Sequence, residues 1–290
     1  MTFKRVSFLG LPVDVNGDAD TVCRLLGEKK VSRLITFIGP GAWALARKDP
    51  QYLAALSQMS LVLPDGEVVA LACQLLTGEK TRRTKFDMTS VARRFFEKAL
   101  AEKIKVALVG GEPSVDEHMH AKLESLYPGI NIVETQHGYA DFAPKISAVV
   151  AKSPDVVIVD MDTPRQETFM LALQGAGYKG AIITCSHFFE HYLSEAGNNV
   201  CPKWIEALHL RFLYQFYQEP EQSWRRYLVD YPLFFVLVLQ SFAELLFKKG
   251  EASFSELSVN VRKAKQGAKK RLATEVISNL VRRVFSPVSN

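Results

Sequence analysis

The sequence predicts an α/β fold in which a doubly wound, mostly parallel sheet is followed by a helical C-terminal appendage. Short apolar runs alternate with helix-length segments through about the first 200 residues, and this alternation is typical of parallel strands joined by crossover helices. Polar residues and glycines follow the runs where strands would end, and after Pro202 the pattern changes to helix alone. We therefore predict an α/β domain over residues 1–200 and a basic helical appendage over residues 201–290.

Length and composition are those of an intracellular globular protein. A chain of 290 residues, 48% hydrophobic and 23% charged, can bury a full core. Its four cysteines stand far apart, without the spacing of a zinc site or a disulfide framework, so we expect reduced thiols. The N-terminal residues lack the apolar stretch of a signal peptide. These features predict a cytoplasmic protein.

The first half of the chain is expected to supply three strands and four helices. The strands are predicted at residues 3–9, 32–38 and 61–63. The helices are predicted at residues 19–29, from 41 toward 56, from 67 to 76 and from 87 to 100. A polar turn through Asn16 and Asp18 is expected after the first strand, and Asp87 is a good N-cap for the last of these helices.

The second half repeats the pattern more clearly. Strands are predicted at residues 105–109, 130–133, 156–160 and 181–184, with helices between them and on both faces of a Rossmann-like sheet. The carboxyl ends of parallel strands share one edge of a sheet, so the residues that follow the strands should converge there. These residues are Gly39, Asp65, Gly110, Gly138 and Asp162.

The stretch from Val156 to Glu167 is the main candidate for ligand binding. An apolar, β-branched run breaks into polar residues, and Pro164 then suits the first position of a helix. The free N–H groups at the start of such a helix suit a diphosphate. Arg165 and Gln166 would project from the first turn as a cation and an amide donor, whereas Glu167 could instead buttress the loop.

A second interpretation of the same stretch is metal binding. Asp160, Met161 and Asp162 spell the DxD pattern by which many nucleotide-sugar enzymes hold a divalent ion. Asp160, however, ends a strand where its side chain could face away from a ligand. We therefore expect no metal cofactor, with this pair of carboxylates as the remaining alternative. His187, at the end of the last strand, could contact substrate or be an ordinary loop histidine.

Basic charge is concentrated at the C-terminus. Residues 248–290 hold ten Lys and Arg against three Glu, whereas the whole chain has a formal net charge of +5. Apolar residues recur among these charges, which indicates a basic amphipathic helix or helix pair suited to an anionic bilayer surface. We expect no nucleic-acid partner, because the tail lacks a reader motif. The apolar run from Pro232 to Leu239 is too short to span a bilayer.

Several short motifs occur in a fixed order along the chain, and the most specific of them is Pro164-Arg165-Gln166-Glu167. The others are Phe8 to Asp14, Leu63-Pro64-Asp65-Gly66, Val109-Gly110-Gly111, Tyr127-Pro128-Gly129, His137-Gly138-Tyr139, Cys201-Pro202-Lys203-Trp204 and Arg225-Arg226-Tyr227. This ordered set resembles the WecG/TagA/CpsF family of bacterial glycosyltransferases. The resemblance implies inverting transfer of a sugar from a UDP-sugar to a glycan on polyprenyl diphosphate, in exopolysaccharide or surface polysaccharide synthesis. It also implies a peripheral place on the inner face of the cytoplasmic membrane, where the appendage closes over the site.

The resemblance and the residue chemistry together assign candidate roles. Asp65 would be the general base that takes the acceptor proton, although the same residue could cap the following helix. The donor would be held by Gly39, Gly110, Gly111, Gly138, Tyr139, Pro164, Arg165, Gln166, Glu167 and His187. The acceptor diphosphate would be gathered by Arg82, Arg83, Asp87, Arg225 and Arg226, unless these form an ordinary basic surface.

A family member without activity is the alternative. Phe37-Ile38-Gly39 stands where the family has Thr-Pro-Asn, and Val200 stands where it has an arginine. Such a protein would bind a nucleotide-sugar or a lipid-linked glycan inside a polysaccharide synthase complex. The sequence names neither the sugar nor the acceptor, and it leaves a homo-oligomer open.

Overall fold

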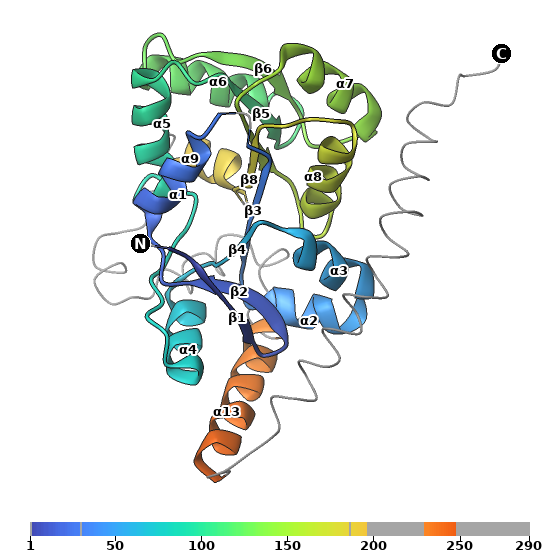
Figure 1. Cartoon of the computed structure of the whole chain (residues 1–290). Helices are drawn as coiled ribbons and strands as arrows, with labels where there is room; N and C mark the ends of the chain where they lie inside the picture. Colours follow the sequence, from blue (N-terminus) through green and yellow to red (C-terminus); the bar gives the residue numbers. More distant parts are fainter. Residues whose placement is uncertain (1, 30, 186, 196–228, 248–290) are drawn as a thin grey trace, which may run out of the picture.

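A six-stranded, all-parallel sheet forms the centre of the molecule (Figure 1). The computed structural model describes residues 2–29, 31–185, 187–195 and 229–247. The strand order is β4-β3-β8-β7-β5-β6. The strands are β3 (Arg33–Ile38), β4 (Leu61–Pro64), β5 (Val106–Gly110), β6 (Ile132–Gln136), β7 (Val156–Asp160) and β8 (Ala181–Thr184). The predicted α/β class and parallel sheet are confirmed.

Helices cover both faces of the sheet, and the sheet separates the hydrophobic core into two clusters (Figure 1). One cluster includes side chains of α1 (Ala19–Leu26), α5 (Val91–Ala101), α6 (Val115–Leu126) and α9 (Phe188–Glu195). The other includes side chains of α2 (Gly41–Lys48), α3 (Pro50–Gln58), α4 (Glu67–Thr77), α7 (Phe142–Lys152), α8 (Arg165–Gly175) and α13 (Tyr231–Phe247). Along β7, Val157 and Val159 join the second cluster, and Val156 and Ile158 join the first. This alternation is expected of a strand that is buried on both faces.

Two predicted helix boundaries are wrong. The helix predicted from 41 toward 56 is two helices, because the Asp49 side chain accepts hydrogen bonds from the backbone N–H groups of Gln51 and Tyr52 and starts α3 anew. The helix predicted from Asp87 begins at Val91. The Asp87 carboxylate instead accepts a 2.9 Å hydrogen bond from Thr89 N–H in the turn before that helix.

The polar turn predicted after the first strand is preceded by a second strand. β1 (Lys4–Phe8) and β2 (Leu11–Val15) form an antiparallel hairpin, with Leu9 and Gly10 at φ values of 49° and 84° in its two-residue turn. Two positive φ values match a type I′ hairpin turn, although a leucine rarely takes the first of these positions. The hairpin therefore could not be predicted from the two residues of its turn.

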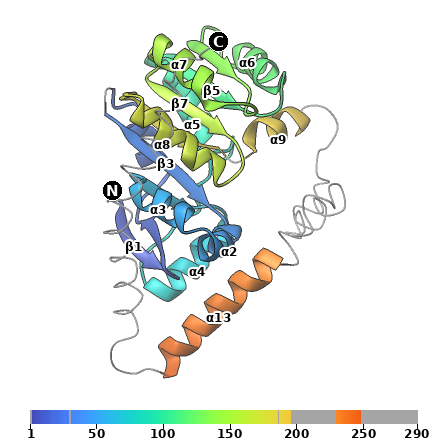
Figure 2. The same cartoon turned by 90° about the vertical axis from the view of Figure 1, so that its right-hand side faces the viewer.

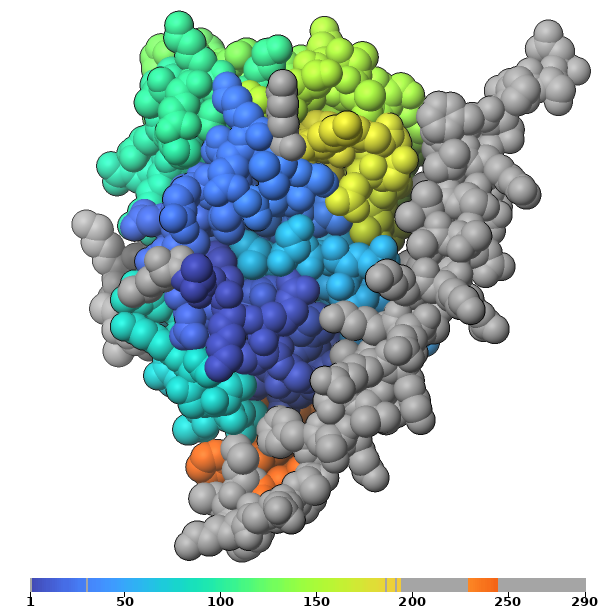
Figure 3. All heavy atoms as spheres, viewed as in Figure 1, coloured from blue at the N-terminus to red at the C-terminus, as the bar shows by residue number. Residues whose placement is uncertain are grey.

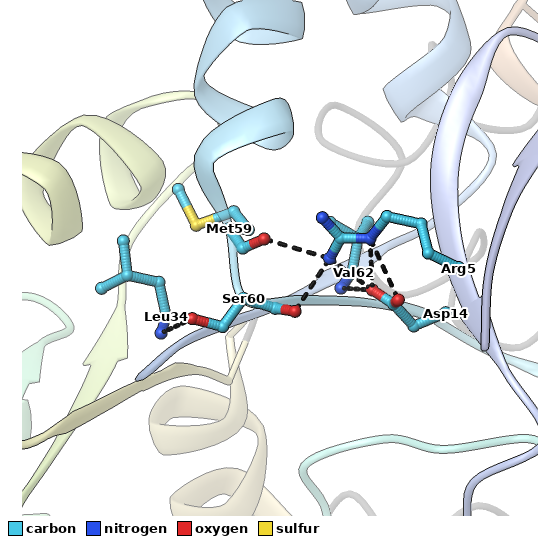
Figure 4. Close-up of polar contacts among 6 residues, drawn as sticks. All are labelled: Arg5, Asp14, Leu34, Met59, Ser60 and Val62. Atoms are coloured by element: carbon cyan, nitrogen blue, oxygen red, sulfur yellow. Dashed lines mark hydrogen bonds and ion pairs between the residues drawn. The ribbon is translucent and has the colours of Figure 1, made fainter. Parts of the chain in front are cut away.

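An ion pair ties the hairpin to the edge of the main sheet (Figure 4). Asp14 of β2 pairs with Arg5 of β1 at 2.6 Å, and its carboxylate also accepts a 2.7 Å hydrogen bond from Val62 N–H of β4. Arg5 donates further hydrogen bonds to the carbonyls of Met59 and Ser60. An edge strand leaves backbone groups without a strand partner, and this clamp satisfies one of them. It thereby fixes β4, the strand that leads into Asp65.

α13 packs against the second core cluster, next to α2 and α4 (Figure 2). Phe234 is fully buried, and its ring centroid lies 4.9 Å from that of Trp43 and 6.3 Å from that of Phe8. The predicted boundary between residues 200 and 201, and most of the appendage that follows it, lie outside the described residues. Within those residues, no helix has both the length and the apolar character needed to cross a bilayer.

Candidate active site

The residues that follow the strands lie at one edge of the sheet. Because β3 to β7 all run parallel, Gly39, Asp65, Gly138 and Asp162 follow their carboxyl ends and Gly110 is the last residue of β5. Ligands of open parallel sheets bind outside this edge. The candidate residues are therefore in the region where a nucleotide would be expected.

A cavity of about 250 Å³ opens at this edge, next to the ends of β5, β7 and β8. The exposed Tyr139 ring belongs to its wall, together with side chains that follow β7 and β8. Five of the predicted donor-binding residues line this cavity: Gly111, Gly138, Tyr139, Arg165 and His187. The cavity is thus built from four segments that are remote in sequence, one after each of β5, β6, β7 and β8.

Glycines at the ends of β5 and β6 let the backbone segments approach closely. Gly110 has a φ of 152°, and a Cβ there would lie 2.1 Å from the carbonyl oxygen of Asp160. Gly138 N–H donates a 2.7 Å hydrogen bond to the carbonyl of Gly111. A side chain at Gly110 would therefore force β5 and β7 apart. These residues shape the cavity through their backbone.

Asp160 is held by the start of α9. Its buried carboxylate accepts hydrogen bonds from the backbone N–H groups of His187 and Phe189, the latter at 2.7 Å. Burial raises the pKa of this carboxyl, and the hydrogen bonds oppose the rise. Asp160 is therefore an anchor for the loop after β8 as well as part of the cavity wall.

His187 and Asp162 form a pair at the cavity. His187 Nε2 lies 3.3 Å from Asp162 Oδ1, and Nδ1 lies 3.9 Å from an oxygen of Glu190. The hydrogen bond to Asp162 raises the pKa of His187, and the same bond lowers the pKa of Asp162. The pair therefore makes the imidazolium form of His187 more stable there than it is in water. Glu190, which the sequence did not single out, is one helical turn beyond His187, and that spacing was the available signal.

The DxD pair therefore does not present two free carboxylates. Asp160 is engaged by backbone N–H groups and Asp162 faces His187. Across the described residues, no three His, Cys, Asp or Glu side chains come together as a metal site.

Arg165 presents a cation to the cavity from the first turn of α8, directly after the N-cap residue Pro164. Its guanidinium donates a 2.6 Å hydrogen bond to the carbonyl of Ala140 and lies 4.9 Å from the ring centre of Phe142. The side chain is exposed and retains further N–H groups for a ligand. A guanidinium held in this way is suited to a phosphate.

Gln166 and Glu167 point into the protein instead of projecting from the first turn. Gln166 is 1% exposed and donates hydrogen bonds to Thr163 Oγ1 and Glu167 Oε1. Glu167 is fully buried and accepts a 2.8 Å hydrogen bond from Thr36 on β3. Burial raises the pKa of the Glu167 carboxyl. Gln166 Oε1 and Glu167 Oε2 are buried and have no hydrogen-bond partner among the described residues, so the two side chains carry unused acceptor capacity.

Asp65 follows the edge strand β4. Its backbone N–H donates a 2.9 Å hydrogen bond to the Ile38 carbonyl, and a Cβ at Gly39 would lie 4.0 Å from Asp65 Oδ2. The N-cap of α4 is Gly66, with no side-chain cap hydrogen bond, so the helix-cap interpretation of Asp65 is wrong. Among the described residues, none donates a hydrogen bond to the half-buried Asp65 carboxylate. β4 and β7 are three strand spacings apart, about 14 Å, which leaves room for an extended ligand between Asp65 and the cavity.

The basic loop after α4 is partly neutralised. Arg82 lies 3.7 Å from Asp18, and Arg83 pairs with Asp87 at 2.6 Å. Exposed pairs of this kind are weak and can exchange for a ligand. Arg225 and Arg226, the other predicted acceptor-site residues, lie outside the described residues.

A parallel α/β sheet with a glycine-walled cavity and a separate carboxylate at its carboxyl edge is an architecture suited to a nucleotide-dependent group transferase. Residues 6–247 match the model of the glycosyl transferase WecG/TagA/CpsF family, so the chain belongs to this family and is a glycosyltransferase. The resemblance found in the motifs is confirmed.

Two curated relatives are similar to most of the chain. A UDP-Gal:alpha-D-GlcNAc-diphosphoundecaprenol beta-1,4-galactosyltransferase of Shigella boydii is 27% identical over 216 residues, which cover 73% of this chain and 88% of that protein. An N-acetylglucosaminyldiphosphoundecaprenol N-acetyl-beta-D-mannosaminyltransferase of Bacillus spizizenii is 25% identical over 197 residues, which cover 67% of this chain and 74% of that protein. Both names describe transfer to a sugar on diphosphoundecaprenol.

Proposed function

We propose that this glycosyltransferase moves a sugar, with inversion, from a UDP-sugar to a glycan carried on polyprenyl diphosphate. The single observation that carries the proposal is the Asp65 carboxylate, which lies beside Gly39 at the same sheet edge as the cavity and accepts no hydrogen bond from the described part of the chain. The activities for which the two relatives are named support a lipid-linked acceptor, and one of them also supports a UDP-sugar donor. The product would serve exopolysaccharide or surface polysaccharide assembly on the inner face of the cytoplasmic membrane.

In the proposed reaction, the donor binds across the sheet edge. The nucleotide end occupies the cavity beside Tyr139, and Arg165 with His187 supplies positive charge toward the diphosphate. The sugar extends toward β4, where Asp65 takes the proton of the acceptor hydroxyl as that oxygen attacks the anomeric carbon. The bond to the diphosphate breaks on the opposite side, and the diphosphate leaves with the electron pair.

The proposal includes no metal ion. The developing charge on the departing diphosphate would be stabilised by Arg165 and by the N–H groups at the start of α8. Gln166 would join them only if its amide turned outward from its buried position.

The test is transfer by the full-length protein in detergent micelles. Purified chain, polyprenyl-diphosphate N-acetylglucosamine and individual UDP-sugars are combined, and UDP release is measured with and without acceptor. We expect acceptor-dependent release with one or a few donors, unchanged by EDTA. Donor binding without release in any combination would contradict the proposal and support a non-catalytic binding role. Loss of release on chelation would contradict the metal-free mechanism alone.

A further inference from the structure

His187 has an uncommon backbone conformation in the cavity wall. Its φ of 63° lies in the left-handed region, which residues other than glycine adopt rarely and at an energetic cost. The backbone N–H of His187 donates a hydrogen bond to the buried carboxylate of Asp160, which holds the residue there. The side chain lines the cavity and is 61% exposed. The backbone therefore fixes the ring at a place that a ligand can reach.

The two ring nitrogens of His187 have different surroundings. Nε2 lies 3.3 Å from Asp162 Oδ1, whereas Nδ1 lies 3.9 Å from an oxygen of Glu190, which is too far for a hydrogen bond. A neutral imidazole that donates from Nε2 carries only a lone pair on Nδ1, but an imidazolium donates from both nitrogens. Only the protonated ring can therefore stay on Asp162 and also donate a hydrogen bond to a phosphate oxygen.

Carboxyl groups outnumber cations in the cavity wall. Asp160, Asp162 and Glu190 line the cavity, against Arg165 and His187. If His187 is neutral, a single guanidinium faces three carboxyl groups, and the diphosphate of a donor meets an excess of negative charge. The proton on His187 therefore decides how nearly the cations balance the carboxyl groups.

Charged groups also reach this region from α6 and α8. Arg165 belongs to α8, whose yellow atoms lie next to the lime atoms of α7 in Figure 3. Lys122 of α6 meets α9 farther along, where it donates a 3.2 Å hydrogen bond to the carbonyl of Tyr192. Glu112, before α6, adds negative charge near Glu190. In the part of the chain that the structure describes, Arg165 is thus the one permanent cation that lines the cavity.

We infer that His187 takes up a proton when the diphosphate of a UDP-sugar binds, so that the protonated ring controls the affinity of the donor site. The inference rests on the proposed function and deepens it, because it states how that site is regulated. The proton comes from water: Nε2–H stays on Asp162, and the new Nδ1–H donates to a phosphate oxygen. A bound phosphate stabilises the charged ring, and by linkage the charged ring binds the phosphate more tightly.

The ring is already prepared for this step. The hydrogen bond to Asp162 raises the pKa of His187 and brings its titration toward neutral pH. In the free protein the proton is therefore lost as the pH rises through this raised pKa. In the complex the added negative charge of the diphosphate should keep the proton on the ring to a higher pH. Between these two pH values, donor binding and proton uptake occur together.

The test is calorimetric titration of the full-length protein with UDP-galactose and with UDP-N-acetylglucosamine, without acceptor, from about pH 6 to about pH 8.5. The diphosphate of a UDP-sugar does not titrate in this range, so a change in Kd with pH belongs to the protein. Titrations in HEPES and in Tris, whose ionisation enthalpies differ, give the number of protons taken up. Far-UV circular dichroism and thermal unfolding verify that every variant is folded.

Two variants and one control separate the ring from its surroundings. His187→Asn removes the titrating group, and asparagine also adopts a positive φ. Asp162→Asn keeps the ring but removes its hydrogen-bonded carboxylate. The matched control is His118→Asn, because His118 is exposed on α6 and does not line the cavity.

We expect the Kd of the wild type and of His118→Asn to be constant at low pH and then to rise by up to about tenfold per pH unit, with up to about one proton taken up. In Asp162→Asn the rise should begin at a lower pH. His187→Asn should bind about tenfold more weakly at low pH, because a hydrogen bond to a charged group is lost, and its Kd should no longer change with pH.

Donor binding by the wild type without proton uptake would overturn the inference, and so would an unchanged pH dependence in His187→Asn. Either result leaves the proposed sugar transfer intact, because transfer is measured separately as acceptor-dependent UDP release. Absence of binding of both UDP-sugars at every pH would instead overturn the proposed donor site, and the inference with it.

Discussion

The hydroxyl of Thr36 on β3 donates a 2.8 Å hydrogen bond to Oε1 of Glu167 on α8, across 131 positions of the chain. Both side chains are fully buried, and the Thr184 hydroxyl of β8 lies 3.3 Å from that of Thr36. This network joins two neighbouring strands to the first turn of the helix that carries Arg165. The position of the cavity wall therefore depends on a buried carboxyl group that the ligand does not need to touch.

Glu167→Ala is predicted to lower the free energy of unfolding by about 2–4 kcal/mol. The change removes the buried oxygen that accepts hydrogen bonds from Thr36 and Gln166, and it opens a cavity. Glu167→Gln keeps the shape and one acceptor oxygen and should cost less. Urea denaturation of the wild type and both variants measures the effect. A loss of under about 0.5 kcal/mol in the Ala variant would contradict a structural role for this network.

The stability difference between the wild type and Glu167→Gln should depend on pH. Burial raises the folded-state pKa of Glu167 above its ordinary value of 4.5, so the folded protein binds this proton more tightly than the unfolded chain does. The stability that the folded protein gains from binding this Glu167 proton more tightly is therefore complete below pH 4.5, and it is lost as the pH rises through the folded-state pKa of Glu167. Denaturation curves at several pH values should show the wild type losing stability relative to the Gln variant across this window. A constant difference would contradict the raised pKa.

Asp162→Asn is predicted to bring the pKa of His187 down toward 6.5. The hydrogen bond to Asp162 is the largest cause of the raised pKa, and Asp160 and Glu190 contribute less. In the wild type this pair stabilises the fold below pH 6.5, and its contribution is lost as the pH rises through the folded-state pKa of His187. A nuclear magnetic resonance titration of the His187 ring protons measures the shift. Identical titration curves in the two proteins would show that the pair does not form in solution.

Arg165→Lys is predicted to raise the KM for the UDP-sugar about tenfold, with a smaller effect on kcat. Lysine keeps the charge but loses the planar fork and the contact with Phe142, and one phosphate contact of this kind is worth about 1.4 kcal/mol or more. Steady-state kinetics in micelles measures the change. Arg93→Lys, at an exposed arginine on α5, is the matched control and should leave KM unaltered. Equal KM values in both variants would remove Arg165 from the donor site.

The fold could be predicted from the sequence because its strands are strongly patterned. Val156 to Val159 form a continuous β-branched run, and polar residues follow at the strand end, as a strand buried on both faces requires. β2 gave no such signal, since Pro12 and Asp14 are uncommon strand residues. Asp14 is in β2 because Arg5 and Val62 N–H use its carboxylate, and those contacts exist only after the hairpin meets the sheet.

The candidate site was predictable only in part. Strand-end position was enough to bring Arg165 and His187 to one cavity, because parallel strands share their carboxyl edge. Helix position alone could not tell that Gln166 turns inward, because that orientation depends on Thr163 and Glu167. The role of Thr36 was also out of reach, since its partner is on a different element far along the chain.

The most direct test of the proposed mechanism is turnover and donor binding in Asp65→Asn. If Asp65 is the general base, the change removes proton transfer and should lower kcat by about 10²–10⁴-fold. Calorimetric titration should give a Kd for the UDP-sugar within about twofold of the wild type, because the cavity does not include Asp65. Turnover within about threefold of the wild type would contradict the central assignment of Asp65 as the base.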